Sequence, residues 1–161
     1  MQKITFITPD FAVAGQLEAE DFAEIARLGF KTVLNNRPDG EENSQLPNYA
    51  AASHALLSGL DYHYIPSGKL DLFSDQVVNA AETALRAANG PVLAYCKSGT
   101  RSAIIWAAAS ARNLPVDEVL ALLLNAGFDF DFLRDDLQLQ ASAGSRVAAD
   151  GEAPVELLEA A

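Results

Sequence analysis

The sequence is poor in the residues that build disulfides, metal sites and membrane spans. Its 161 residues include one cysteine and two histidines. A single cysteine excludes an internal disulfide. The histidines, His54 and His63, do not form a spaced ligand pair, so we expect no metal site. No apolar run approaches the ~20 residues of a membrane span. There is also no glycine-rich nucleotide fingerprint, and we expect no cofactor.

Positive charge is also scarce. The chain has 11 Lys and Arg residues against 22 Asp and Glu residues, a formal net charge of -11. Such acidity argues against nucleic acid or an anionic membrane as a partner. The first nine residues lack the long apolar stretch of a signal peptide, so we expect a cytoplasmic protein, where a reactive thiol stays reduced. The sequence does not predict an oligomeric state.

The hydrophobic pattern alternates between short strands and helices. Strands are expected over 4–7, 31–35, 62–65 and 92–95, and helices over 21–28, 48–58, 75–88, 102–112 and 115–127. This order predicts an α/β fold with a mostly parallel central sheet flanked by helices. A short helix is expected from Phe128. We expect a catalytic domain over 1–138 and a disordered C-terminal tail over 139–161, which has few large apolar residues.

The lone cysteine lies in an unusual context. Cys96 follows the apolar run 92–95, with Gly99 three residues later and Arg101 at the start of the next helix. Backbone N–H groups of such a loop and the helix N-terminus converge on one point and favour an anion there. The same field stabilises the thiolate, the nucleophilic form of cysteine. We therefore predict that Cys96 and Arg101 are catalytic. The remaining loop residues are expected to bind the anion: Lys97, Ser98, Gly99, Thr100 and Ser102.

Two resemblances follow from these and other motifs. Cys96–Ser102 resembles the active-site loop of single-domain rhodaneses, which are sulfurtransferases. The segments Asn35–Glu41, Gly59–Pro66 and Ala126–Asp129 resemble the phosphatase-like domain of bacterial beta-lactamase hydrolase-like proteins. The resemblance covers roughly the first 135 residues. It implies a fold like that of the dual-specificity phosphatases, related to the three-layer sandwich of the rhodaneses.

Loop length separates the two chemistries at the level of sequence. Cysteine phosphatases have five residues between the cysteine and the arginine, whereas four residues separate Cys96 from Arg101, as in rhodaneses. The sequence is therefore interpreted as a sulfurtransferase that carries a persulfide on Cys96. Its partners would be a small sulfur donor, thiosulfate or a persulfide, and a thiol acceptor. Because the family domain also occurs fused to other enzymes, a partner enzyme of sulfide oxidation is expected.

Two alternatives stay open. A cysteine-dependent phosphatase would work through a phosphocysteine and would need a general acid for the leaving oxygen, for which Asp71 is the better candidate. A non-catalytic module would use Cys96 to sense a persulfide or an anion. Arg37, directly after a predicted strand, is expected either to pair with Glu41 or Glu42 or to support the site as a neighbour of the Cys96 loop.

Overall fold

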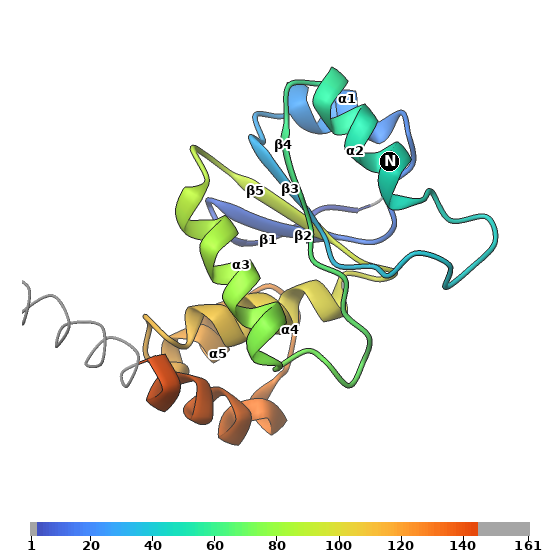
Figure 1. Cartoon of the computed structure of the whole chain (residues 1–161). Helices are drawn as coiled ribbons and strands as arrows, with labels where there is room; N and C mark the ends of the chain where they lie inside the picture. Colours follow the sequence, from blue (N-terminus) through green and yellow to red (C-terminus); the bar gives the residue numbers. More distant parts are fainter. Residues whose placement is uncertain (1–2, 145–161) are drawn as a thin grey trace, which may run out of the picture. The chain divides into compact units, whose positions relative to one another are not determined.

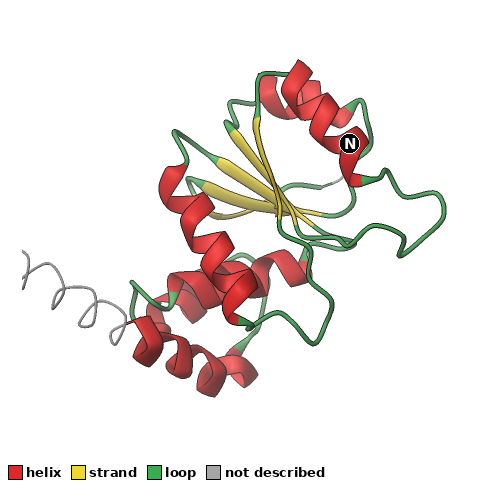
Figure 2. Cartoon of the chain, in the orientation of Figure 1, coloured by secondary structure: helices red, strands yellow, loops and turns green. Residues whose placement is uncertain are grey.

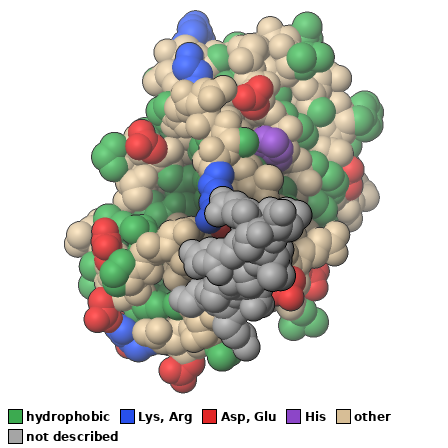
Figure 3. Space-filling model, turned by 60° about the vertical axis from the view of Figure 1, so that its left-hand side comes forward, with side chains coloured by type: hydrophobic (Ala, Val, Ile, Leu, Met, Phe, Trp, Pro, Cys, Tyr) green, Lys and Arg blue, Asp and Glu red, His purple; other side chains and the backbone are tan. Residues whose placement is uncertain are grey.

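The structure is a computed structural model that describes residues 3–144. Internal contacts divide the described residues into two compact units, one that ends at Trp106 and one that begins at Ala107. The first unit holds the sheet and all the predicted site residues. Within the described part of the chain, no helix combines the length and the apolar character needed to cross a bilayer. On the face seen in Figure 3, acidic side chains are spread out among apolar and uncharged ones.

The first unit is built on a five-stranded sheet. Its strands are β1 (Thr5–Thr8), β2 (Phe11–Ala14), β3 (Thr32–Asn35), β4 (Asp61–Tyr64) and β5 (Val92–Tyr95), in the order β1-β2-β5-β3-β4. β1 is antiparallel to β2, and all other pairs are parallel. The predicted mostly parallel sheet is confirmed. The sequence pattern did not reveal β2, which follows β1 after a two-residue turn.

Helices cover the sheet on both faces (Figure 1). α1 (Asp21–Arg27) and α2 (Asn48–Leu57) lie on one face, and α3 (Asp75–Ala87) lies on the other. The first turns of α4 (Thr100–Ser110) also cover this second face, because the Trp106 ring stacks on Phe11 with 5.6 Å between centroids. The predicted helix start at Ser74 is confirmed, since its hydroxyl accepts a hydrogen bond from the Val77 N–H at 3.3 Å.

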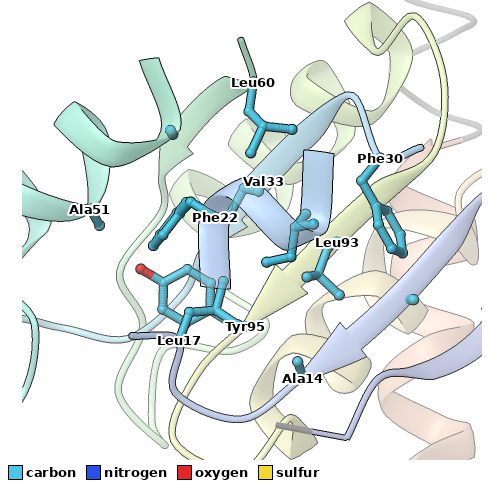
Figure 4. Close-up of a cluster of buried hydrophobic side chains, with 12 residues drawn as sticks. Ala14, Leu17, Phe22, Phe30, Val33, Ala51, Leu60, Leu93 and Tyr95 are labelled. Atoms are coloured by element: carbon cyan, nitrogen blue, oxygen red, sulfur yellow. The ribbon is translucent and has the colours of Figure 1, made fainter. Parts of the chain in front are cut away.

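The core beneath α1 and α2 fixes the strand that leads to the cysteine. Phe22 of α1 meets the Tyr95 ring edge-on at 6.5 Å, and both residues are buried (Figure 4). Val33 of β3 and Leu93 of β5 are fully buried in the same cluster. Each such side chain contributes about 1.5–3 kcal/mol through burial. Packing therefore holds the end of β5 rigidly in place one residue before Cys96.

The second unit contains the end of α4, α5 (Val116–Asn125) and a 3₁₀ turn, Asp131–Leu133, that leads into a helix over 134–144. Arg134 pairs with Asp117 of α5 and with Asp131. The expected short helix after Phe128 thus takes the form of the 3₁₀ turn. Residues 139–144 of the predicted tail complete the helix over 134–144, and the remainder of that tail, 145–161, lies outside the described residues.

Candidate active site

Parallel strands bring the sequence-predicted residues to one edge of the sheet. Cys96 follows β5, and its neighbour β3 leads into the loop 36–47, while β4 leads into the loop 66–74. Figure 2 shows these two loops leaving the sheet at the same edge. Ligands of parallel sheets bind beyond the carboxyl ends of the strands. The position of Cys96 agrees with that rule.

The loop after β5 wraps around the cysteine sulfur. Cys96 is fully buried, and its Sγ accepts a hydrogen bond from the Gly99 N–H at 3.1 Å. Gly99 has a φ of +93°, which side-chain-bearing residues rarely adopt, and this turn aims its N–H back at the sulfur. A backbone donor aimed at sulfur stabilises the thiolate more than the thiol. The loop therefore supplies part of the field that the sequence predicted.

Arg101 is held in a single orientation by acceptors from two other loops. Its Nη1 and Nη2 each donate to a Glu41 carboxylate oxygen at 2.8 Å, and Nη1 also donates to the Ser67 carbonyl at 2.8 Å. The hydrogen bonds that Arg101 donates to Glu41 are the main cause that raises the pKa of Arg101, and the nearby Cys96 side chain adds to it. The guanidinium thus lies beside the sulfur in a fixed geometry. Sequence reasoning did not find this pairing.

Arg37 shares Glu41 with Arg101. Its Nε donates to Glu41 Oε1 at 3.0 Å, and its Nη1 donates to Gln16 Oε1 at 2.9 Å. The Arg37 side chain is buried, with 3% of its surface exposed, so its charge requires the carboxylate. Hydrogen bonds from Arg101 and then Arg37 lower the pKa of Glu41 to about 2. The expected pairing of Arg37 with Glu41 or Glu42 is confirmed. Because Arg37 and Arg101 donate to the same carboxylate, Glu41 links the two arginines.

Lys97 is paired in a similar way. Its Nζ lies 2.8 Å from Glu42 Oε1, and this contact is the main reason that the pKa of Glu42 is lowered. Arg37 Nη2 lies 3.4 Å from the same oxygen. Glu41 and Glu42 therefore bring two carboxylates to three cations, Arg37, Lys97 and Arg101. We call these two residues the carboxylate pair.

The hydroxyls of the loop make local contacts. Ser98 donates to Thr100 at 3.3 Å, and both side chains are exposed. Ser102 lies inside α4 and donates to the Asn36 side-chain oxygen at 2.8 Å, which makes it a tie to the loop after β3. Asn36 is buried, and its amide also donates to the Ile65 carbonyl at 3.0 Å. Asn36 thus joins the loop after β3 to α4 and to the end of β4, a role that only the fold reveals.

Asp71 lies in the loop 66–74, with an exposed side chain. It lines a hollow of about 320 Å³ together with Tyr64, Pro66 and residues of α3. Pro66 is followed directly by Ser67, whose carbonyl accepts a hydrogen bond from Arg101, so the loop that lines the hollow also contacts the cysteine site. Among the described residues, no three His, Cys, Asp or Glu side chains gather as metal ligands would.

A match to a known protein family favours the phosphatase over the sulfurtransferase. Residues 3–113 match the family described as "Beta-lactamase hydrolase-like protein, phosphatase-like domain". The chain belongs to this family. A beta-lactamase hydrolase-like protein of Xylella fastidiosa is 34% identical over 148 residues, which cover 91% of this chain and 34% of that protein. The chain therefore spans about a third of the length of the curated relatives it matches.

Solved structures that resemble this chain include proteins described as phosphatases. A Neisseria meningitidis protein assigned as a phosphatase is 32% identical, with a TM-score of 0.71, and the match covers 85% of this chain and 97% of that one. The core catalytic domain of the PP-IP phosphatase SIW14 from S. cerevisiae is 16% identical, with a TM-score of 0.61 and 92% of each chain covered. The second likeness shows the fold alone. Together they confirm the cysteine-phosphatase-like fold expected from the sequence.

These relationships correct the prediction of a sulfurtransferase. The interpretation of the chain as a rhodanese-like enzyme with a persulfide on Cys96 was wrong, because both the family and the structural relatives are phosphatase-like. The thiosulfate donor and the thiol acceptor were expected only as part of that interpretation. Loop length was a misleading criterion because the loop is only part of the anion cradle. The Arg101 side chain is placed by Glu41 and Ser67, 60 and 34 positions away in the sequence.

Proposed function

We propose that this chain is a cysteine-dependent phosphatase domain that hydrolyses phosphate monoesters through a phosphocysteine on Cys96. The observation that carries the proposal is the fixed pair of groups at the end of β5. The Cys96 sulfur accepts the Gly99 N–H, and the Arg101 guanidinium is held beside it by Glu41 and Ser67. A nucleophile and a planar cation at one anion-binding loop suit attack on a phosphoryl group.

The reaction has two displacements. The Cys96 thiolate attacks phosphorus, the bond from phosphorus to the ester oxygen breaks, and Asp71 donates a proton to the departing oxygen. The Asp71 carboxylate then takes a proton from water, which attacks the phosphocysteine and breaks the sulfur–phosphorus bond. Phosphate leaves and the thiolate is restored. N–H groups of the loop and Arg101 stabilise the charge on the phosphoryl oxygens in both steps.

The direct test is phosphate release from an aryl phosphate by the purified chain. We expect turnover in the parent and none above background in Cys96→Ser, because serine at this position lacks a stabilised anionic nucleophile. Intact mass measured after rapid quenching should show a phosphoryl adduct that is absent from the variant. Normal turnover in Cys96→Ser would exclude the mechanism. We further propose a cytoplasmic location, since the nucleophilic thiol must stay reduced, and no nucleic-acid partner, given the net charge of -11.

A further inference from the structure

The anion site is surrounded by carboxylates rather than by free cations. Four segments form its rim at the carboxyl edge of the sheet: 15–20, 36–47, 66–74 and 96–101. They carry four cationic side chains, Arg37, Lys69, Lys97 and Arg101, against six carboxylates, Glu18, Glu20, Asp39, Glu41, Glu42 and Asp71. A phosphatase for polyphosphorylated substrates would need an excess of positive charge here. This rim has the opposite balance.

The carboxylate pair offsets most of the positive charge of Arg37, Lys97 and Arg101. Glu41 accepts hydrogen bonds from both terminal nitrogens of Arg101 and from the Nε of Arg37. Glu42 forms an ion pair with Lys97. The pKa values of both carboxyls are lowered by these cations, so the two residues are ionised at neutral pH. Three cations face two anions before a substrate enters. One net positive charge is therefore left to face the thiolate and the substrate. This charge offsets only part of the charge of one phosphate, and none is left for a second phosphate.

Arg101 can still bind one phosphoryl group. Its five N–H groups include three that donate to Glu41 and Ser67. Within the described part of the chain, the hydrogen bonds to other loops leave its Nε–H and one Nη2–H, which lie on a single edge of the guanidinium. Two parallel donors on one edge match two oxygens of a single oxyanion. The carboxylate pair thus leaves room for one phosphate and removes the further donors that a second would need.

The surface beside Asp71 suits an uncharged leaving group. The hollow that Asp71 lines shares Tyr64, Ile65 and Ala80 with a second hollow of about 530 Å³. This second hollow runs between β4 and α3 and contains His63 but no Lys, Arg, Asp or Glu. The two hollows adjoin at these shared residues as one groove. Asp71, the proposed general acid, lines its first part, and apolar surface dominates the second part. Such a groove accepts an apolar group and offers a second phosphate no ion partner.

From these observations we infer that the carboxylate pair makes this site selective for phosphomonoesters with an uncharged, partly apolar leaving group and rejects substrates with a second phosphate. The inference rests on the proposed phosphatase function and assigns its substrate class. Glu41 and Glu42 are then specificity-determining residues. They act by setting the charge around Cys96, and neither exchanges a proton with the substrate.

The test compares two esters with the same ring, phenyl phosphate and benzene-1,4-diyl bisphosphate. We expect the parent to prefer phenyl phosphate in kcat/KM by about tenfold or more, with a higher KM for the bisphosphate. Glu42→Gln should reduce this preference about three- to tenfold by freeing Lys97, and added salt should reduce it in the parent. The matched control is Asp10→Asn, which removes one negative charge from the turn before β2, at the opposite edge of the sheet. It should leave the preference unchanged.

A binding measurement separates this inference from the phosphatase proposal. Titration calorimetry of Cys96→Ser with both esters should give a lower Kd for phenyl phosphate, and adding Glu42→Gln should narrow the gap. Phosphate release without such a preference, or an equal change in Asp10→Asn, would overturn the inference and leave the phosphatase function intact. Absence of both phosphate release and ester binding would instead refute the phosphatase function itself, and the inference with it.

Discussion

The two loops that follow β3 and β4 are held in different ways. In loop 36–47, side chains make the ties. The Arg37 N–H donates to the Asn35 side chain, and the Asp39 N–H donates to the Tyr64 hydroxyl, each at 2.9 Å. Loop 66–74 is tied to the loop before it at Ser67, whose N–H donates to the Asn36 carbonyl at 3.0 Å. The backbone bonds of Asp71 stay within its own turn, to Gly68 and Ser74.

This difference matches what each loop must do in the proposed reaction. Loop 36–47 orients the Arg101 guanidinium, and an orientation is useful only if the group that sets it does not move. Loop 66–74 presents an exposed carboxyl that must release one proton and take up another from water. The first loop should therefore be sensitive to substitution in both stability and activity. Asp71 in the second loop should be sensitive in activity alone.

The largest expected effect is on the second loop. Asp71→Asn removes the proton donor and should lower kcat for an alkyl phosphate by about 10²–10⁴. Its effect should shrink for 4-nitrophenyl phosphate, whose leaving oxygen needs little protonation. Urea unfolding should be unchanged, because the side chain is exposed. Equal losses of kcat for both esters would show that Asp71 does not act as the acid.

Glu41→Gln should affect both properties of the first loop. The amide keeps the shape but loses the charge that balances Arg101 and the buried Arg37. We expect the free energy of unfolding to fall by about 1–2 kcal/mol and KM to rise. The measurement is urea denaturation together with steady-state kinetics. Asp10→Asn, in the turn before β2 at the opposite edge of the sheet, serves as the control. A stable variant with normal KM would mean that Glu41 does not hold Arg101.

The ionisation of Glu41 gives a pH dependence with a definite sign. Its pKa is about 2 in the folded chain and 4.5 ordinarily, so the unfolded chain binds more protons between these values. The stabilisation is complete above about pH 4.5 and is lost as the pH falls towards 2. Unfolding free energies measured across this window should decline less steeply in Glu41→Gln than in the parent. Parallel pH profiles would contradict the assignment.

The smallest expected effect is on the tip of the second loop. Leu70 has 99% of its surface exposed, so Leu70→Ser removes no buried contact. The free energy of unfolding should change by less than about 0.5 kcal/mol. Thermal and urea unfolding measure it directly. A larger loss would show that loop 66–74 is packed as firmly as loop 36–47, and the contrast between the loops would fail.

Local sequence predicted the framework of the site well. The strand 92–95 was predicted to the residue, because an apolar run between a turn and a glycine-containing loop permits little else. Ser74 capped its helix as expected, and Arg37 paired with acidic residues four and five positions along the chain. These features depend on neighbours in sequence. β2 is as short and apolar as β5, but it follows β1 after only two residues, and the hydrophobic pattern did not separate it as a strand of its own.

The sequence by itself determined that Cys96 would stand at a strand end before a helix, with Arg101 near it, since spacing and strand direction dictate that arrangement. Only the tertiary structure decided what Arg101 touches. Glu41 and Ser67 reach it from loops after two other strands, and Ser102 meets Asn36 across 66 positions. The length of the cysteine loop could not reveal the chemistry. The anion-binding site is completed by side chains from several loops, which the parallel strands bring to one edge of the sheet. These residues are far apart in the sequence, so no local pattern predicts that they come together.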